Sequence, residues 1–202
     1  MPESPAAEVS ALRSAHRRAR AALPESRQQR NAERLADRLS ALPAFRSART
    51  LAGYCAVRGE ISLEPVLHIA AELGKVVHLP ILRDGTMAFA PWTPGAPLER
   101  RDLGLLEPHH DPSARVPPAD IDLVLAPLVV FDDHCQRIGQ GGGFYDRSFA
   151  FRLDPAVRTP VLIGVAHDMQ REARLRPMPW DVPLDMIATE QQLYIREDAL
   201  TP

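Results

Sequence analysis

The sequence predicts an α/β protein built as a single three-layer domain, in which helices flank a central, mainly parallel sheet in a Rossmann-like arrangement. Three observations favour this fold class. Strand-like and helical segments alternate from residue 50 onward, as they do in βαβ units. The run Ile121–Val130 is apolar almost throughout, which is typical of a parallel strand covered on both faces. A chain of 202 residues suits one domain with a substantial core. We therefore expect one domain over residues 1–202, with helices over 8–42 packed on an α/β core over 50–196.

Two helices are predicted before this core. Residues Glu8 to Leu23 are mostly good helix formers, and Pro24 suits the first turn of a second helix. That second helix carries an apolar stripe at spacings of three and four residues: Ala32, Leu35, Leu39 and Leu42. We expect Pro43 to close it, because proline is not tolerated in a helix interior.

The core begins with a βαβ unit. A strand, a helix and a second strand are predicted over Thr50–Val57, Leu63–Leu73 and Val76–Leu82. Asp84 and Gly85 then form a turn into Thr86–Trp92, which we expect to pair as a hairpin. The run Val161–Val165 has the same apolar character as the predicted central strand and adds a further strand to the sheet.

Composition and charge narrow the class of protein. With 45% hydrophobic and 25% charged residues the chain is typical of globular proteins, and its net charge of −2 gives no overall attraction to nucleic acid or to anionic membranes. No apolar run approaches the ~20 residues that span a bilayer, and the first residues lack the apolar segment of a secretory signal. Two cysteines are too few for a zinc cage or a disulfide framework. We expect a cytoplasmic monomer that binds small molecules and neither nucleic acid nor membrane.

A glycine-rich segment follows the apolar run Ile121–Phe131 and precedes a helix-like stretch. It reads Arg-Ile-Gly-Gln-Gly-Gly-Gly-Phe-Tyr-Asp-Arg from Arg137 to Arg147. Four of its residues lack a Cβ atom, so the backbone can adopt positive φ and approach a ligand closely: Gly139, Gly141, Gly142 and Gly143. Since the N–H groups of such a loop, and of the helix start behind it, attract anions, the sequence predicts a phosphate site here.

Charged side chains at the ends of this loop favour the same prediction. Arg137 and Arg147 carry guanidinium groups that match phosphate oxygens, and Asp146 supplies a hard oxygen of the kind that Mg²⁺ prefers beside a nucleotide. Neither a P-loop nor a dinucleotide fingerprint fits, because Gly143 is followed by Phe144. The alternative is a glycine-rich turn in which Asp146 only complements the helix dipole.

Several motifs occur in a fixed order along the chain: Gly59-Glu60-Ile61, Leu103–Pro108, Phe131-Asp132, Arg137–Arg147, Gly164–Gln170 and Trp180–Asp185. Together they resemble the 5-formyltetrahydrofolate cyclo-ligase family, also called 5,10-methenyltetrahydrofolate synthetases. The resemblance extends through most of the chain. It implies cyclisation of 5-formyltetrahydrofolate to 5,10-methenyltetrahydrofolate, which depends on ATP and Mg²⁺, releases ADP and phosphate, and passes through a phosphorylated formyl intermediate.

The resemblance also assigns the candidate site residues. Those expected to bind ATP are Arg13, Arg17, Arg137, Gly139, Gln140, Gly141, Gly142, Gly143, Phe144 and Tyr145. Those expected to bind the folate are Cys55, Glu60, Gln140, Gly141, Gly142, Gly143 and Phe144. We expect Arg137 and Tyr145 to act in catalysis and Asp146 and Asp181 to hold Mg²⁺.

This sequence departs from the family pattern at three positions. Relatives are similar in having a Lys-x-x-x-Arg pair on the first helix; here Arg13 fits the arginine, Val9 stands at the lysine, and Arg17 is the candidate replacement. Phe144 stands where relatives often carry tyrosine. Cys135 stands where they usually have glycine, and it is strained if that turn requires positive φ.

Plainer interpretations stay open for most of these residues. Arg13, Arg17 and Arg20 share one helix face, which could be a solvated basic face. Glu60 could be a surface loop acid, and Asp181 a turn-forming residue with Asp185 as its rival for a metal. His167 is best interpreted as a histidine with satisfied hydrogen bonds at a strand end.

Two functions of other classes also remain. One is a folate- or nucleotide-binding protein of the same fold without catalysis. The other is a nucleic-acid binder that uses the arginine-rich first helix, which the near-neutral charge of the chain disfavours.

Overall fold

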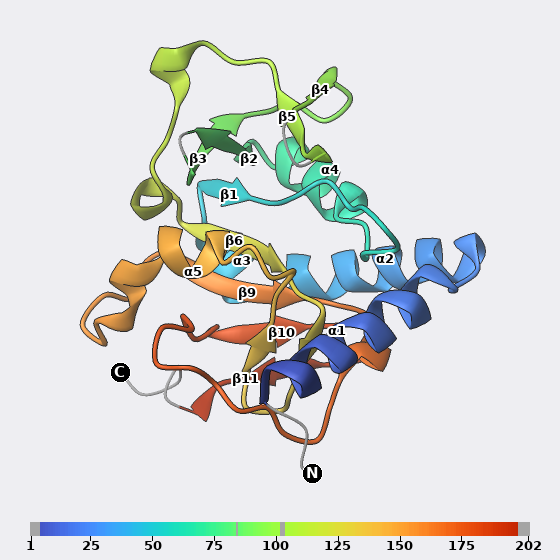
Figure 1. Cartoon of the computed structure of the whole chain (residues 1–202). Coiled ribbons are helices and arrows are strands. Elements are labelled where there is room, and N and C mark those ends of the chain that lie inside the picture. Colours follow the sequence, from blue (N-terminus) through green and yellow to red (C-terminus); the bar gives the residue numbers. More distant parts are fainter. Residues whose placement is uncertain (1–4, 84, 102–103, 198–202) are drawn as a thin grey trace.

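The computed structural model describes residues 5–83, 85–101 and 104–197 (Figure 1). A seven-stranded sheet forms its centre, with the strand order β11-β10-β9-β6-β1-β2-β3. The strands of this sheet are β1 (Thr50–Ala52), β2 (Val76–Arg83), β3 (Thr86–Pro91), β6 (Leu123–Pro127), β9 (Val161–Val165), β10 (Met186–Ala188) and β11 (Leu193–Ile195). The five inner strands are parallel, and only β3 and β11 at the edges run antiparallel to their neighbours. The predicted α/β fold with a mainly parallel sheet is therefore confirmed.

Helices lie on both faces of this sheet. They are α1 (Pro5–Ala21), α2 (Glu25–Ser40), α3 (Pro43–Ser47), α4 (Glu64–Glu72) and α5 (Phe144–Ser148), with short 3-10 turns η2 (Pro112–Ala114), η3 (Pro118–Asp120), η4 (Ala150–Leu153) and η5 (Asp168–Gln170). Residues alternate between the faces along each strand. In β6, Leu123 and Leu125 pack with α2 and α4, whereas Val124 and Ala126 pack with Phe149 on the opposite face.

The predicted helices and strands other than Ile121–Val130 are confirmed apart from details at their ends. Pro24 stands just before α2 as its N-cap, and α2 ends at Ser40, so that Pro43 starts the separate helix α3. The first strand is shorter than predicted, because the chain leaves the sheet after Ala52 to build the turn around Gly59. The hairpin of β2 and β3 forms as expected, while Asp84 of its turn lies outside the described residues. No helix in the described ranges has the length and apolar character needed to cross a membrane.

The prediction of one strand over Ile121–Val130 is wrong. The chain leaves the sheet after β6, and β7 (Val130–Phe131) pairs instead with β8 (Arg137–Ile138) in a separate hairpin. Side chains explain the break. The carbonyl of Leu128 accepts hydrogen bonds from Arg20 Nη1 and Gln170 Nε2, which take the place of a strand partner. Another two-stranded sheet pairs β4 (Leu98–Arg100) with β5 (Leu106–Pro108).

A buried carboxylate shapes the turn between β7 and β8. Asp132 is fully buried, and its Oδ1 accepts hydrogen bonds from the N–H groups of His134 and Gln136, while Oδ2 accepts from Leu175 N. Within this turn Cys135 is buried and has φ of 61°. The turn therefore does require positive φ at this position, which is the condition under which a cysteine there is strained.

Because the left-handed conformation disfavours a Cβ atom, we expect Cys135→Gly to be more stable than Cys135→Ala by about 1 kcal/mol. Both substitutions remove the same thiol, and only glycine relieves the backbone. Urea unfolding of the two variants measures the difference. Equal free energies of unfolding would show that the turn stores no strain at Cys135.

A second buried carboxylate ties η4 to the sheet. Asp185 accepts two hydrogen bonds from Arg152 Nη2, at 2.7 and 2.8 Å, and another from the backbone N–H of Leu162 at the start of β9. Arg196 Nη2 lies 3.3 Å from the same carboxylate. Asp185, the rival candidate for a metal ligand, is thus engaged by two guanidinium groups.

We expect Asp185→Asn to lower the free energy of unfolding by about 3 kcal/mol, since it leaves Arg152 buried with its charge unpaired. The matched control is Asp133→Asn, which breaks the exposed pair of Asp133 and Arg171 and should change stability by less than about 1 kcal/mol. Denaturant titration compares the two. Similar losses in both variants would contradict a structural role for the buried pair.

Candidate nucleotide and folate site

Glu60 lies beyond the carboxyl end of β1 and is 7% exposed. Its Oε1 accepts hydrogen bonds from Arg20 Nη2 at 3.2 Å and from Gln140 Nε2 at 2.5 Å, and its Oε2 accepts from Val57 N at 3.1 Å. A carboxylate this deeply buried is stable only when it is paired and hydrogen-bonded. Glu60 is therefore an anchored group facing the glycine loop, and the interpretation of Glu60 as an exposed loop acid is wrong.

The turn before Glu60 is held against α1. Arg58 and Gly59 both have positive φ, of 52° and 74°. A Cβ atom at position 59 would lie 2.8 Å from the carbonyl oxygen of Arg20, so only glycine fits. Arg20 itself is 1% exposed, and its Nε donates to the carbonyl of Arg58. Arg20 thus fixes both the backbone of the turn and the carboxylate that the turn presents.

The basic face of α1 packs on the glycine loop. Arg13 Nε donates to the carbonyl of Gly139 at 2.9 Å. Arg17 Nη2 donates to the carbonyl and to the side-chain oxygen of Gln140, at 2.6 and 2.7 Å. Burial, and then the charges of Arg13 and Arg20, lower the pKa of Arg17. The interpretation of this face as merely solvated is therefore wrong. The basic face of α1 brings several guanidinium groups to the glycine loop.

The glycine loop turns its carbonyl groups toward arginines. Besides the contacts of Arg13 and Arg17, Arg147 Nη1 donates to the carbonyl of Gly142. Gly141 and Gly143 adopt the expected positive φ, of 104° and 62°. Within the described chain, no backbone N–H of residues 139–143 has a protein acceptor. The loop therefore has free amide donors beside a cluster of positive charge, which is the arrangement that binds anions in backbone nests.

The strand before this loop and the helix after it differ from the expected ones. It follows the two-residue strand β8 instead of the central strand, and the helix behind it, α5, has only five residues. A helix of one turn contributes little macrodipole. The free N–H groups and the arginines, more than a helix start, make this loop suited to an anion.

Arg137 and Asp146 form a pair at the base of the loop. Arg137 Nη2 lies 2.5 Å from Asp146 Oδ1, and Arg137 Nη1 donates to the carbonyl of Val182. The same Asp146 oxygen accepts from the N–H of Val182, the neighbour of Asp181. The side chain of Asp146 thus contacts the backbone of the residue that follows Asp181. Asp181 Oδ2 accepts from Met178 N, so the turn-forming role of Asp181 is also present.

Two aromatic side chains, Phe144 and Tyr145, directly follow the glycine loop. Burial, and then the charge of Glu60, raise the pKa of the Tyr145 phenol, while Arg137 opposes the shift. Tyr145 stays neutral at physiological pH and can donate a proton in a hydrogen bond. Phe144 packs under the guanidinium of Arg147, 5.0 Å from ring centroid to Cζ. Cys55 is half-buried against the core, and burial raises the pKa of its thiol.

Gln140 occupies the space directly beside Glu60. Two cavities, of about 840 Å³ along α2 and about 520 Å³ beside β3, lie elsewhere, and neither is lined by Glu60 or by the loop. The loop is nonetheless open to solvent, since residues 140–142 are exposed. On the side of the loop, the Oε1 atom of Glu60 is thus occupied by the Gln140 side chain.

Sequence analysis missed the importance of Arg20, the residue that joins these parts. Its spacing placed it with Arg13 and Arg17 on one helix face, but nothing in that spacing distinguishes a buried arginine from an exposed one. The need for a positive charge beside a buried Glu60 would have indicated that one of these arginines is buried.

Comparisons with known proteins identify relatives of this chain. The profile of the 5-formyltetrahydrofolate cyclo-ligase family matches residues 5–190. The chain is 31% identical over 185 residues to the 5-formyltetrahydrofolate cyclo-ligase of Escherichia coli K12, an alignment that covers 88% of this chain and 98% of the relative. It is 31% identical over 192 residues to the enzyme of that name from Mycolicibacterium smegmatis, covering 91% and 94%.

Solved structures show the same similarity. The NMR structure of Aquifex aeolicus 5,10-methenyltetrahydrofolate synthetase superimposes with a TM-score of 0.80 at 29% identity and covers 96% of this chain and 95% of its own. The Mycoplasma pneumoniae 5,10-methenyltetrahydrofolate synthetase shares the fold, with a TM-score of 0.70 at 24% identity over 90% of this chain and 98% of its own. From the family profile, the relatives and the shared fold together, the chain belongs to the 5-formyltetrahydrofolate cyclo-ligase family.

Proposed function

We propose that this protein cyclises 5-formyltetrahydrofolate to 5,10-methenyltetrahydrofolate, using ATP and Mg²⁺ and releasing ADP and phosphate. One observation carries the proposal beyond family membership. The N–H groups of residues 139–143 have no protein acceptor while arginines hold the loop carbonyls, and this loop touches the buried Glu60 through Gln140. These contacts support a phosphate site that adjoins a site for a hydrogen-bonding ring.

The chemistry explains why these two sites should meet. A formamide carbon is a poor electrophile, and its oxygen is a poor leaving group. When the formyl oxygen attacks the γ-phosphorus of ATP, ADP leaves and the oxygen becomes a phosphate ester. The N10 nitrogen then attacks the activated formyl carbon and gives up its proton to water, and phosphate departs as the new C–N bond completes the ring. Phosphoryl transfer needs alignment and charge neutralisation more than a protein nucleophile.

The protein's own residues would supply that alignment. Arg13 and Arg17, with the loop amides, bind the phosphates of ATP, and Arg137 neutralises charge on the transferred group. Glu60 accepts hydrogen bonds from the pterin ring in place of Gln140. The neutral Tyr145 phenol donates a hydrogen bond at the loop and does not serve as a base.

The two carboxylates Asp146 and Asp181 fit a magnesium ion that is held mainly by phosphate. Each has one oxygen in a hydrogen bond to protein, and the described chain contains no cluster of three or more potential metal-ligating side chains. Mg²⁺ accepts such sites, since it keeps several waters and takes one or two carboxylates plus phosphate oxygens. When bound it would neutralise charge on the phosphates. The expected single-domain organisation, monomeric state and cytoplasmic location stay predictions.

The reaction is tested directly by following the absorbance of the methenyl product with purified protein and 5-formyltetrahydrofolate. We expect product only when both ATP and Mg²⁺ are present, with one ADP released per product. Arg137→Ala should reduce turnover by roughly a hundredfold or more, as expected for a group that neutralises charge in the transition state. Binding of folate and ATP without product would favour the alternative, a non-catalytic binding protein of the same fold.

The replacement of the missing helix lysine by Arg17 gives a separate expectation. Arg17→Ala should raise the KM for ATP by about tenfold, because it removes a charge-assisted contact to phosphate. Arg18→Ala is the matched control, since Arg18 is the exposed neighbour on the same helix and should leave this KM unchanged. Initial rates at varied ATP concentration measure both. An unchanged KM in the Arg17 variant rules out its phosphate role.

A further inference from the structure

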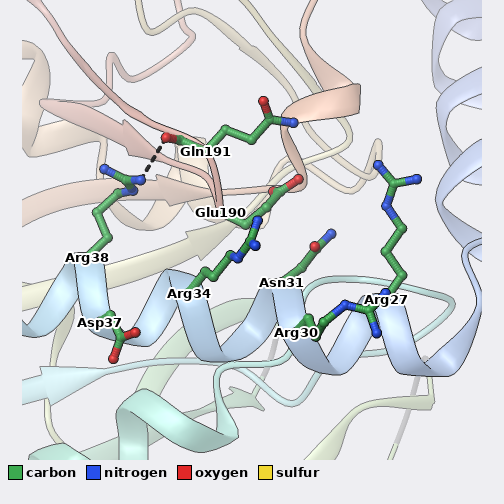
Figure 2. Close-up of a pocket in the computed structure, with 8 residues that line it drawn as sticks. All are labelled: Arg27, Arg30, Asn31, Arg34, Asp37, Arg38, Glu190 and Gln191. Atoms are coloured by element: carbon green, nitrogen blue, oxygen red, sulfur yellow. Dashed lines mark hydrogen bonds between the residues drawn. The ribbon is translucent and has the colours of Figure 1, made fainter.

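A basic groove runs along α2 (Figure 2), and its lining includes none of residues 139–143. It has a volume of about 840 Å³ and lies between α2 and the loop that joins β10 to β11. Four arginines of α2 line it: Arg27, Arg30, Arg34 and Arg38. Asn31 of α2 and Glu190 of the β10–β11 loop also contribute to the lining. None of these arginines belongs to the candidate nucleotide and folate site.

The spacing of these arginines produces a continuous stripe. Steps of three, four and four residues keep side chains on one side of a helix that has about 3.6 residues per turn. The distance along the axis from Arg27 to Arg38 is roughly 16 Å at about 1.5 Å per residue. An extended ligand with several charged groups therefore matches the groove better than a single small ion.

Only one of the four guanidinium groups is used by the fold. Arg38 donates to the carbonyls of Thr189 and Gln191, at 3.0 and 2.7 Å, and so fastens the β10–β11 loop to α2. Arg27, Arg30 and Arg34 are exposed, and in the described ranges no ion pair or hydrogen bond engages their guanidinium groups. Three cationic groups thus remain available to a ligand.

The charge of the groove has the opposite sign to that of the chain. Its four arginines face two carboxylates, Asp37 and Glu190, which leaves a net charge of +2 on a chain whose net charge is −2. Glu190 is buried, and its Oε2 accepts a hydrogen bond from Asp168 N, so it serves the loop structure. The groove is therefore a local anion-attracting surface.

The inner wall of the groove is connected to the turn that carries Glu60. Asn31 Nδ2 lies 2.9 Å from His167 Nδ1, and His167 Nε2 lies 3.2 Å from the carbonyl of Gly59. Burial lowers the pKa of His167 to about 4, so the neutral ring accepts from Asn31 and donates to Gly59. The prediction that His167 has satisfied hydrogen bonds is confirmed. The His167 side chain alone lies between Asn31 of the groove and the turn of Gly59 and Glu60.

We propose that the groove along α2 is a second anion site, which takes a small extended ligand with two or more carboxylate or phosphate groups. Planar guanidinium groups suit both kinds of anion. The ligand could come from two sources, the acidic glutamate end of a folate or a free oligophosphate. The proposal does not rest on the proposed reaction, because binding is measured without turnover.

Isothermal titration of the full chain with inorganic tripolyphosphate, and separately with a triglutamate peptide, tests the proposal. We expect saturable binding of at least one ligand, and the tighter one identifies the source. Arg30→Ala/Arg34→Ala should weaken this binding at least about tenfold, since it removes two charge-assisted contacts. Circular dichroism checks that the double variant folds.

Two control variants separate this groove from other basic surfaces. Arg46→Ala removes an exposed arginine of α3 and should leave the affinity unchanged. Arg17→Ala should weaken only tripolyphosphate binding at the glycine loop and leave binding in the groove unchanged. The proposal is overturned if neither ligand saturates, or if the Arg30 and Arg34 double variant binds both ligands as tightly as the original chain. Loss of binding in the Arg17 variant alone would assign the anion to the glycine loop.

Discussion

The buried ion pair of Arg20 and Glu60 is the contact on which the candidate site depends. Burying a carboxylate is unfavourable unless a charge and hydrogen bonds compensate it, and Arg20 supplies both. The same guanidinium binds the carbonyls of Arg58 and Leu128, so α1, the turn after β1 and the segment after β6 meet at one point. Because Arg20 fixes the position of α1, the other arginines on that helix face necessarily reach the glycine loop.

The arginines around the glycine loop determine which of its backbone groups are hydrogen-bonded. Arg13, Arg17 and Arg147 take up loop carbonyls, and the amide N–H groups of residues 139–143 are left without protein acceptors. A flexible loop would have to be ordered when a ligand binds, and that ordering reduces affinity. Here the arginines hold the backbone before any ligand arrives. Gln140 completes the arrangement by donating a hydrogen bond to Glu60, which gives the buried carboxylate a further partner.

Periodicity and composition were sufficient to predict the layers of the fold, because burial on one face or two leaves a regular pattern in α2, β2 and β9. They could not predict that the run Ile121–Val130 is divided. Its residues are buried on both sides of the break, and the partners that end the strand, Arg20 and Gln170, are distant in sequence. The same limit applies to the site. Residue spacing placed Arg17 on a basic face, but only the folded chain shows that this face contacts Gln140. The positive φ of Gly141 and Gly143 could be predicted from the sequence, because it is a local property of the backbone at a glycine.

We propose that Glu60, held by Arg20, receives the folate when Gln140 leaves it. A structure of the protein bound to 5-formyltetrahydrofolate tests this most directly. We expect the pterin ring to donate hydrogen bonds to the Glu60 carboxylate, with the Gln140 side chain displaced and the pair of Arg20 and Glu60 retained. A folate bound elsewhere, with the hydrogen bond between Gln140 and Glu60 intact, would contradict the account.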